Sequence, residues 1–270
     1  MEEAAEAPSS PEAAAGHPVD AERRFGGLRR LYGELGYSRL REGAVAIVGL
    51  GGVGSWAAEA LARSGVQRLL LFDLDHVAES NINRQVQALG STLGMSKGDA
   101  LRERFADIHP DGQVDVIDDF VTAENWPALL TSPVDVLIDA CDQVRAKTAL
   151  AAWSLATNVP LVCVGAAGGK RRPQAVEVAD LAETTHDPLL ASLRQRLRKL
   201  HGAPRQGRIG VRCVFSHENV ASPADAQCDV DGSLNCHGYG SSVTVTATFG
   251  MVAAAEAVSQ LIAAAGPRLR

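Results

Sequence analysis

Residues 45–55 read VAIVGLGGVGS, an apolar run that ends in a cluster of glycines. Gly49, Gly51 and Gly54 have the G-x-G-x-x-G spacing, and Gly52 adds a fourth glycine between them. A strand that turns into a helix at such a loop brings its backbone close to phosphate, and the helix N-terminus favours the negative charge. The stretch therefore predicts a nucleotide site at the end of a first strand, without choosing the nucleotide.

The rest of the chain predicts an α/β fold, because short apolar or β-branched runs alternate with helical patterns. The expected architecture is a Rossmann-like, mostly parallel sheet with helices on both faces, in a single domain with a C-terminal elaboration. Strands are expected at residues 44–48, 68–73, 114–117, 134–139 and 160–165. Helices are expected to begin near Val53, Met95, Thr122 and Arg145.

Within a domain that spans residues 21–270, the core is expected at 44–168 and the elaboration at 169–270. The elaboration contains two strand patterns, an amphipathic helical pattern, a loop-like stretch and a final apolar run. These elements are expected at residues 174–182 (strand), 187–200 (helix), 207–215 (strand), 217–240 (loop) and 243–265 (core helix).

The composition indicates a soluble, cytoplasmic protein. The chain has 270 residues, and its five cysteines include no C-x-x-C pair, which argues against a disulfide framework or a zinc knuckle. Residues 1–20 are rich in Ala, Pro and Glu, lack the basic and apolar regions of a targeting peptide, and are expected to be a disordered tail. Polar residues interrupt the final apolar run, so no membrane insertion is expected.

Polar residues after the second expected strand favour ATP over NAD. Asp73 ends that strand at the usual distance for a carboxylate that binds ribose hydroxyls, and Asn81, Arg84, Gln85 and Lys97 follow it. Hydride transfer to a nicotinamide gains nothing from a guanidinium beside the phosphates. Nucleotidyl transfer, in contrast, needs cationic and amide donors on the charge that develops at phosphorus.

A second group of charged residues follows the fourth expected strand, where Asp139, Asp142 and Arg145 occur within seven positions of DACDQVR. The carboxyl ends of parallel strands face the ligand crevice, so Asp142 is a candidate ligand for Mg²⁺ bound to ATP. Arg145 is a weaker candidate for binding phosphate or substrate. For each residue taken alone, a solvated surface charge is the alternative.

Together, GxGGxGS, DxDxVxxSNxNRQ, the following Lys97 and DACDQVR resemble the motifs of the ubiquitin-activating-enzyme-like superfamily, over about residues 23–168. Members adenylate a carboxylate with ATP and Mg²⁺. The resemblance assigns the four glycines to phosphate and Asp73 to ribose. Family dimers insert an N-terminal arginine into the partner's site, so a homodimer is expected, with Arg24 or Arg30 in that role. Four further residues are assigned by the resemblance to binding the ATP phosphates and stabilising the transition state, namely Asn81, Arg84, Gln85 and Lys97.

Two features narrow this resemblance. Members that adenylate sulfur carriers usually have two C-x-x-C pairs for zinc, and this chain has none. The segments RRFGGLRRLYG, VGAAGGK, DPLLASLRQRL, GVRCVFSHE and VTATFGMVAA resemble the tRNA threonylcarbamoyladenosine dehydratase family. That family cyclises the threonylcarbamoyl group on adenosine 37 of tRNA. The alternatives are an activator of a small sulfur-carrier protein and a non-catalytic nucleotide-binding scaffold.

The chemistry that this family implies needs no protein nucleophile. The substrate carboxylate attacks the α-phosphate of ATP, which gives an acyl adenylate and pyrophosphate. A neighbouring atom of the same side chain then closes the ring and expels AMP, a step that benefits from proximity. A catalytic role for Cys236 in LNCHGYGSS is therefore not required, and assistance by a sulfur-relay partner such as a cysteine desulfurase stays open.

A tRNA substrate calls for a cationic surface, although the net charge is −6. No acidic residue lies between Asp187 and Glu218. Together with Lys170, Arg171 and Arg172, this segment is expected to form a phosphate-binding face, with a solvated helix face as the alternative. Its cations are Arg194, Arg196, Arg198, Lys199, Arg205, Arg208 and Arg212.

Overall fold

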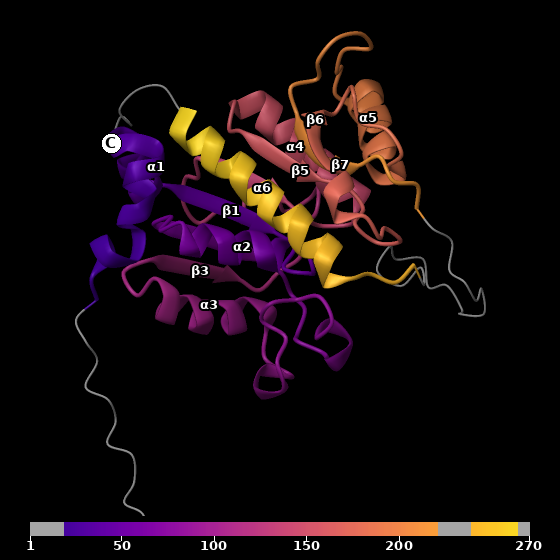
Figure 1. Ribbon diagram of the computed structural model, residues 1–270. Coiled ribbons are helices and arrows are strands. Elements are labelled where there is room, and N and C mark those ends of the chain that lie inside the picture. Colours follow the sequence, from indigo (N-terminus) through magenta and orange to yellow (C-terminus); the bar gives the residue numbers. More distant parts are fainter. Residues whose placement is uncertain (1–18, 221–238, 264–270) are drawn as a thin grey trace, which may run out of the picture.

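The fold is a single sheet covered by helices on both faces, seen in a computed structural model that describes residues 19–220 and 239–263 (Figure 1). The strand order is β3-β2-β1-β4-β5-β7-β6. Its neighbours are parallel except for β6 and β7, which confirms a mostly parallel sheet. The strands are β1 (Ala44–Val48), β2 (Arg68–Phe72), β3 (Gln113–Ile117), β4 (Val136–Asp139), β5 (Leu161–Val164), β6 (Val176–Asp180) and β7 (Arg212–Ser216).

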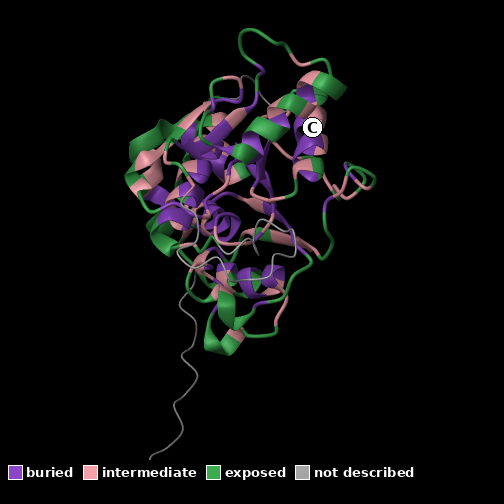
Figure 2. Cartoon of the chain, turned by 90° about the vertical axis from the view of Figure 1, so that its right-hand side faces the viewer, coloured by how far each residue is buried: buried purple, intermediate pink, exposed green. Residues whose placement is uncertain are grey.

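Alternate residues of the central strands face two separate apolar cores. In β1, Val45 and Ile47 belong to the core beneath α2 and α6, whereas Ala46 and Val48 belong to the core beneath α4 and α5. This is the alternation expected of a strand that is buried on both faces. Figure 2 shows the buried strands enclosed between helices whose outer sides are exposed. The helices are α1 (Ala21–Glu42), α2 (Gly54–Arg63), α3 (Lys97–Ile108), α4 (Val144–Thr157), α5 (Pro188–Leu200) and α6 (Val243–Ala263).

The last helix, α6, crosses the sheet beside α2 (Figure 1). It is long and apolar enough to span a bilayer by length and composition, and half of its most apolar window is buried inside the molecule. Phe249, Ala253 and Ala257 are fully buried in the core that it shares with β1 and α2. The packing is that of a core helix, as the interrupted apolar run predicts.

The N-terminal helix α1 was not expected from the sequence. Asp20 caps it by accepting a hydrogen bond from the Arg23 backbone N–H, and Gly33, with φ of +73°, kinks it. Leu40 anchors its second half in the core. Of the tail expected at residues 1–20, residues 1–18 lie outside the described residues, as do 221–238 and 264–270, whereas Asp20 belongs to the start of α1.

The prediction of a helix that begins near Thr122 is wrong. Residues 123–129 form consecutive turns, and the Thr122 and Asn125 side chains bond to nearby backbone groups. Pro127 has no backbone N–H, and its ring clashes with the preceding turn of a helix. Trp126 packs edge-on against Phe72 with ring centroids 5.9 Å apart, so the turns bury an apolar side chain without helical geometry.

Candidate functional site

A cavity of about 530 Å³ opens at the carboxyl ends of β1 and β4. The chain leaves β1 toward β2 on one side, while β4 pairs on the other side. Such a reversal of strand order creates the crevice in which open α/β sheets bind ligands. Residues from the loops after β1, β2, β4 and β5, and from the start of α6, line this cavity.

The glycine loop forms one wall of the cavity. Gly49, Gly51 and Gly52 line it, and a Cβ on Gly51 would meet no atom within 4 Å, so the backbone there is open to a ligand. Gly49 has φ of +87°, and a Cβ on it would lie 2.9 Å from the Ala140 carbonyl oxygen. Gly54 starts α2 behind the cavity wall, where a Cβ would clash with the Gly49 carbonyl oxygen.

Asp73 follows β2 and braces the glycine loop. Its Oδ2 accepts a hydrogen bond from the Leu50 backbone N–H at 2.6 Å, and its Oδ1 accepts one from the Asp75 N–H at 2.9 Å. Burial raises the pKa of Asp73, while the Lys97 charge and the two N–H groups oppose that rise. Asp73 thus holds the loop in shape and also lines the cavity.

Lys97 lies at the start of α3 and lines the same cavity. Its Nζ is 2.6 Å from Asp75 Oδ2 and 3.7 Å from Asp73 Oδ1. The Lys97 side chain is 7% exposed, whereas that of Asp75 is 54% exposed. A desolvated cation with an exposed, exchangeable partner is suited to binding an anionic ligand.

Arg84 lines the cavity next to the glycine loop, with its Cγ 3.1 Å from the position of a Cβ on Gly52. Its Nη1 donates to the Ser80 carbonyl oxygen and to Asn83 Oδ1, at 2.7 and 2.8 Å. Asn83 in turn donates to the Ser241 carbonyl oxygen at 3.0 Å, which connects this turn to the start of α6.

Asn81 and Gln85, expected at the phosphates, do not line the cavity. Asn81 Oδ1 accepts from the Ala78 N–H, and its carbonyl oxygen accepts from the N–H groups of Arg84 and Gln85. Gln85 is buried and bonds to Gln87. The structure therefore places both residues in the turn that presents Arg84.

Asp142 follows β4, lines the cavity and is half-buried. Its carboxylate contacts no partner among the residues that the structure describes. Within the same residues, no three His, Cys, Asp or Glu side chains group together as a metal cage. A single carboxylate at a cavity wall is the kind of ligand that proteins commonly combine with substrate phosphates to hold Mg²⁺. Arg145 is exposed on α4 and does not line the cavity.

A profile of the ThiF family matches residues 25–269. The chain belongs to the ThiF family. The tRNA threonylcarbamoyladenosine dehydratase of Escherichia coli (strain K12) is 41% identical over 254 residues, which cover 90% of this chain and 95% of that protein. The dehydratase of Haemophilus influenzae (strain ATCC 51907 / DSM 11121 / KW20 / Rd) is 38% identical over 245 residues, which cover 89% and 94%.

Solved structures agree with this family membership. The E. coli tRNA N6-threonylcarbamoyladenosine dehydratase in complex with ATP is 42% identical, covers 90% of this chain and 95% of its own, and superposes with a TM-score of 0.82. The same enzyme in complex with AMP covers 92% and 98%, also with a TM-score of 0.82.

Several residues that line the cavity of this ThiF-family chain were not predicted from the sequence. Asn83 lies inside the SNINRQ motif, which was a usable signal. Phe120 follows β3, and Thr246 lies in the first turn of α6, more than 190 positions from the glycine loop. The Thr246 hydroxyl is buried without a hydrogen-bond partner among the described residues. An unsatisfied hydroxyl at a cavity wall is a place where a ligand can bond.

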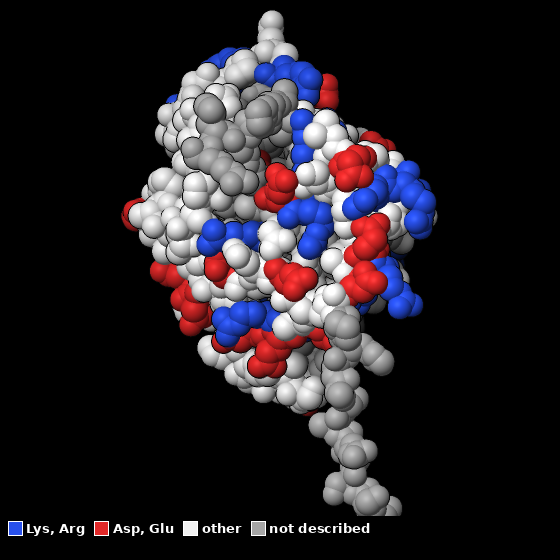
Figure 3. Space-filling view, turned by 90° about the vertical axis from the view of Figure 1, so that its left-hand side faces the viewer, with Lys and Arg blue, Asp and Glu red and all other residues white. Residues whose placement is uncertain are grey.

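The two N-terminal arginines lie away from the cavity within one protomer. Arg24 donates from Nη1 to the carbonyl oxygens of Asp107 and Ile108 at 2.6 and 2.9 Å, and Arg30 is exposed on α1. Figure 3 shows the face that carries α1 and α3, where cationic and acidic side chains are interspersed. Insertion of either arginine into a partner's site stays a prediction.

Part of the basic segment between β6 and β7 is engaged with the protein's own backbone. Arg194 Nη1 donates to the carbonyl oxygens of Leu181 and Thr184, both at 2.9 Å, and Arg198 donates to those of Pro204 and Arg205. Exposed cations of the segment are Lys199, Arg205 and Arg208.

The GGKRR loop presents its cations unequally. Lys170 is buried, and its Nζ donates to the carbonyl oxygens of Ser216 and Glu218 at 3.1 Å. Burial lowers the pKa of Lys170, although nearby carboxylates oppose the shift. The Glu218 carboxylate accepts from the backbone N–H groups of Arg171 and Arg172, whose side chains are exposed. Cys236 and His237 lie outside the described residues.

Proposed function

We propose that this protein is an ATP-dependent tRNA threonylcarbamoyladenosine dehydratase. One observation carries the proposal: a cavity lined by the glycine loop, Arg84, Lys97 and Asp142, in a chain 41% identical to the E. coli dehydratase over 95% of that enzyme. The alternative, activation of a sulfur carrier, is less favoured because the chain lacks the C-x-x-C pairs of those enzymes. A passive scaffold would not need buried Lys97 beside an open phosphate loop.

The cavity fits a nucleoside triphosphate. The open backbone at Gly51 and the N-terminus of α2 suit phosphate groups. Asp73, which follows β2 and lines the cavity, would bind the ribose hydroxyls, and the Thr246 hydroxyl is a further polar group without a partner among the described residues. Arg84 and Lys97 would place positive charge beside the phosphates, where charge develops during nucleotidyl transfer.

Asp142 is the residue that would hold Mg²⁺, because its carboxylate faces the cavity without a described partner. When bound, the cation neutralises phosphate charge and orients the triphosphate. The chain's own residues complete the environment: Asp73 keeps the glycine loop in shape, and the turn containing Asn81 and Gln85 holds Arg84 at the wall.

The reaction then proceeds in two steps that need no protein nucleophile. The carboxylate of threonylcarbamoyladenosine 37 attacks the α-phosphorus of ATP and pyrophosphate leaves. A neighbouring atom of the same side chain attacks the activated carbonyl carbon, gives up its proton, and AMP leaves. The sum is loss of one water from the nucleoside, coupled to cleavage of ATP to AMP and pyrophosphate. Positioning of the two reacting groups within one side chain supplies much of the rate.

Substrate and assembly belong to the same proposal. Arg171 and Arg172 follow Gly168, a residue of the cavity wall, and their exposed side chains are suited to phosphates of a bound tRNA. A homodimer, with Arg24 or Arg30 from one protomer reaching the other, and a cytoplasmic location are expected. A sulfur-relay partner remains an optional addition to this scheme.

The proposal is tested in cells that lack the gene. Mass spectrometry of their tRNA nucleosides is expected to show threonylcarbamoyladenosine in its open form, and a plasmid copy should restore the cyclic form. A copy with Arg84→Ala should not restore it. Cyclic nucleoside at normal levels without the gene would contradict the proposed function.

A further inference from the structure

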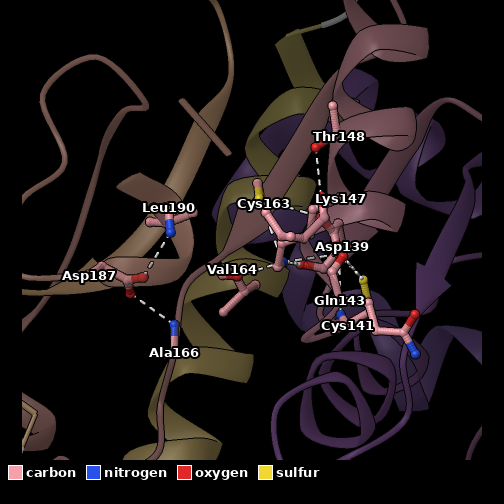
Figure 4. Close-up of polar contacts among 11 residues, drawn as sticks. Asp139, Cys141, Gln143, Lys147, Thr148, Cys163, Val164, Ala166, Asp187 and Leu190 are labelled. Carbon is pink, nitrogen blue, oxygen red and sulfur yellow. Dashed lines mark hydrogen bonds and ion pairs between the residues drawn. The ribbon is translucent and has the colours of Figure 1, made fainter. Parts of the chain in front are cut away.

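Lys147 and Asp139 form a fully buried ion pair (Figure 4), next in sequence to Ala146 and Ala140 of the cavity wall. Both side chains have zero exposure, and Lys147 Nζ lies 3.1 Å from Asp139 Oδ1. Burial by itself would lower the pKa of Lys147, but the Asp139 charge raises it above the ordinary lysine value, so the ammonium is kept. Helix α4 thus carries a buried ammonium against the ends of β4 and β5.

This pair ties the ends of two neighbouring strands together. Lys147 Nζ donates to the Val164 carbonyl oxygen at the end of β5, at 2.7 Å, and to the Asp139 carbonyl oxygen at the end of β4, at 3.3 Å. The residues that follow both strands line the cavity, namely Ala140, Cys141, Asp142 and Gln143 after β4 and residues 165–168 after β5.

Asp139 also shapes the loop that carries Asp142. Its Oδ1 accepts from the Cys141 backbone N–H at 3.2 Å and from the Cys141 thiol at 3.0 Å. These bonds turn the chain immediately before Asp142. A second buried acid acts alike after β5: Asp187 Oδ2 accepts from the Ala166 N–H at 2.8 Å, as Figure 4 shows.

Stability alone gives little reason for such a pair. Removing two charges from water is costly, and replacing a buried pair by apolar residues is often neutral or stabilising. A buried, fully bonded pair can instead fix one geometry. We propose that Lys147 and Asp139 are positioning residues, which hold the loop after β4 so that Asp142 meets Mg²⁺ and the triphosphate. This inference rests on the proposed function.

The test uses a charge-free replacement, Asp139→Leu with Lys147→Met, in the full chain. ATP affinity is measured by calorimetry, once with Mg²⁺ and once with EDTA, alongside thermal unfolding and turnover. We expect the double variant to fold and to lose the gain in ATP affinity that Mg²⁺ gives. Turnover should fall by about tenfold to a hundredfold, the range for partners that orient metal-binding groups.

Two further variants keep the outcome decisive. Asp139→Asn keeps the volume of the side chain and serves as the test if the double variant does not fold. It should also reduce the gain in ATP affinity that Mg²⁺ gives. Glu59→Gln is the matched control, because Glu59 is also a buried acid, paired with Arg63 and Arg104 away from the cavity. It should lower the unfolding temperature while leaving the Mg²⁺ effect at the wild-type value.

The outcomes separate the two proposals. If wild-type protein binds no ATP, the proposed function fails and the inference fails with it. If wild type gains affinity from Mg²⁺ and the folded Asp139 variants show the same gain and the same turnover, the proposed function stands and the positioning role is overturned.

Discussion

Two groups of Arg and Lys residues in this molecule both suggest an anion site in the sequence, but their surroundings in the structure differ. Arg84 and Lys97 line the cavity, and Lys97 pairs with carboxylates. Arg194 and Arg198, on α5, donate to backbone carbonyl oxygens of their own chain. The difference teaches that a cation's place relative to the carboxyl ends of the strands, rather than the density of Arg and Lys, indicates a ligand site.

The largest effect should come from Arg84. Arg84→Ala should lower turnover by roughly a hundredfold or more, the scale for removing an electrostatic interaction made in the transition state. Arg194→Ala, the matched change on α5, should leave turnover per folded molecule near wild type. Steady-state kinetics with tRNA and ATP checks both, with circular dichroism to confirm folding. Near-normal turnover for Arg84→Ala would break the comparison.

Asp142→Ala should have an effect of comparable size, and its signature should be the cation dependence. The variant loses the proposed carboxylate ligand, so turnover is expected to fall by roughly a hundredfold and to require more Mg²⁺. A Mg²⁺ titration of the rate measures this. Arg145→Ala is the neighbouring control, since Arg145 is exposed outside the cavity. A Mg²⁺ response identical to wild type would remove Asp142 from the site.

For α5 the comparison predicts an effect on stability. Arg194→Ala should lower the free energy of unfolding by about 1–3 kcal/mol, because the carbonyl oxygens of Leu181 and Thr184 lose their donor. Lys199→Ala, an exposed change on the same helix, should stay within about 0.5 kcal/mol of wild type. Urea unfolding measures both values. Equal free energies of unfolding for the two variants would mean that the hydrogen bonds of Arg194 do not stabilise the fold.

The smallest effect concerns tRNA affinity. Replacing Arg171 and Arg172 by alanine should weaken tRNA binding and leave ATP affinity unchanged. The slope of the logarithm of the tRNA binding constant against the logarithm of the salt concentration should fall in magnitude by about one for each phosphate that is no longer neutralised. The exposed pair Lys199 and Arg205 gives the alternative surface, and its double variant is measured in parallel. Binding titrations at several salt concentrations distinguish the two. If only the second pair changes the slope, the tRNA lies along α5 and the loop after it.

The sequence predicted the strands well because buried parallel strands are short apolar or β-branched runs, a pattern that can be recognised locally. The glycine loop, Asp73 and Asp142 were predicted to lie at one edge, and the structure places them around one cavity. Thr246 was not predictable, since no local pattern links the start of α6 to the glycine loop. Lys147 was missed for a similar reason: DQVRAK looks like an exposed helix start, and only tertiary pairing with Asp139 buries it.

Purified protein, ATP, Mg²⁺ and tRNA that carries threonylcarbamoyladenosine test the central claim most directly. Nucleoside mass spectrometry and nucleotide chromatography are run on the same reaction. The account predicts loss of one water from the nucleoside, with one AMP released for each nucleoside cyclised and no reaction without ATP. An unchanged nucleoside, together with AMP release only when a small sulfur-carrier protein is added, would contradict it.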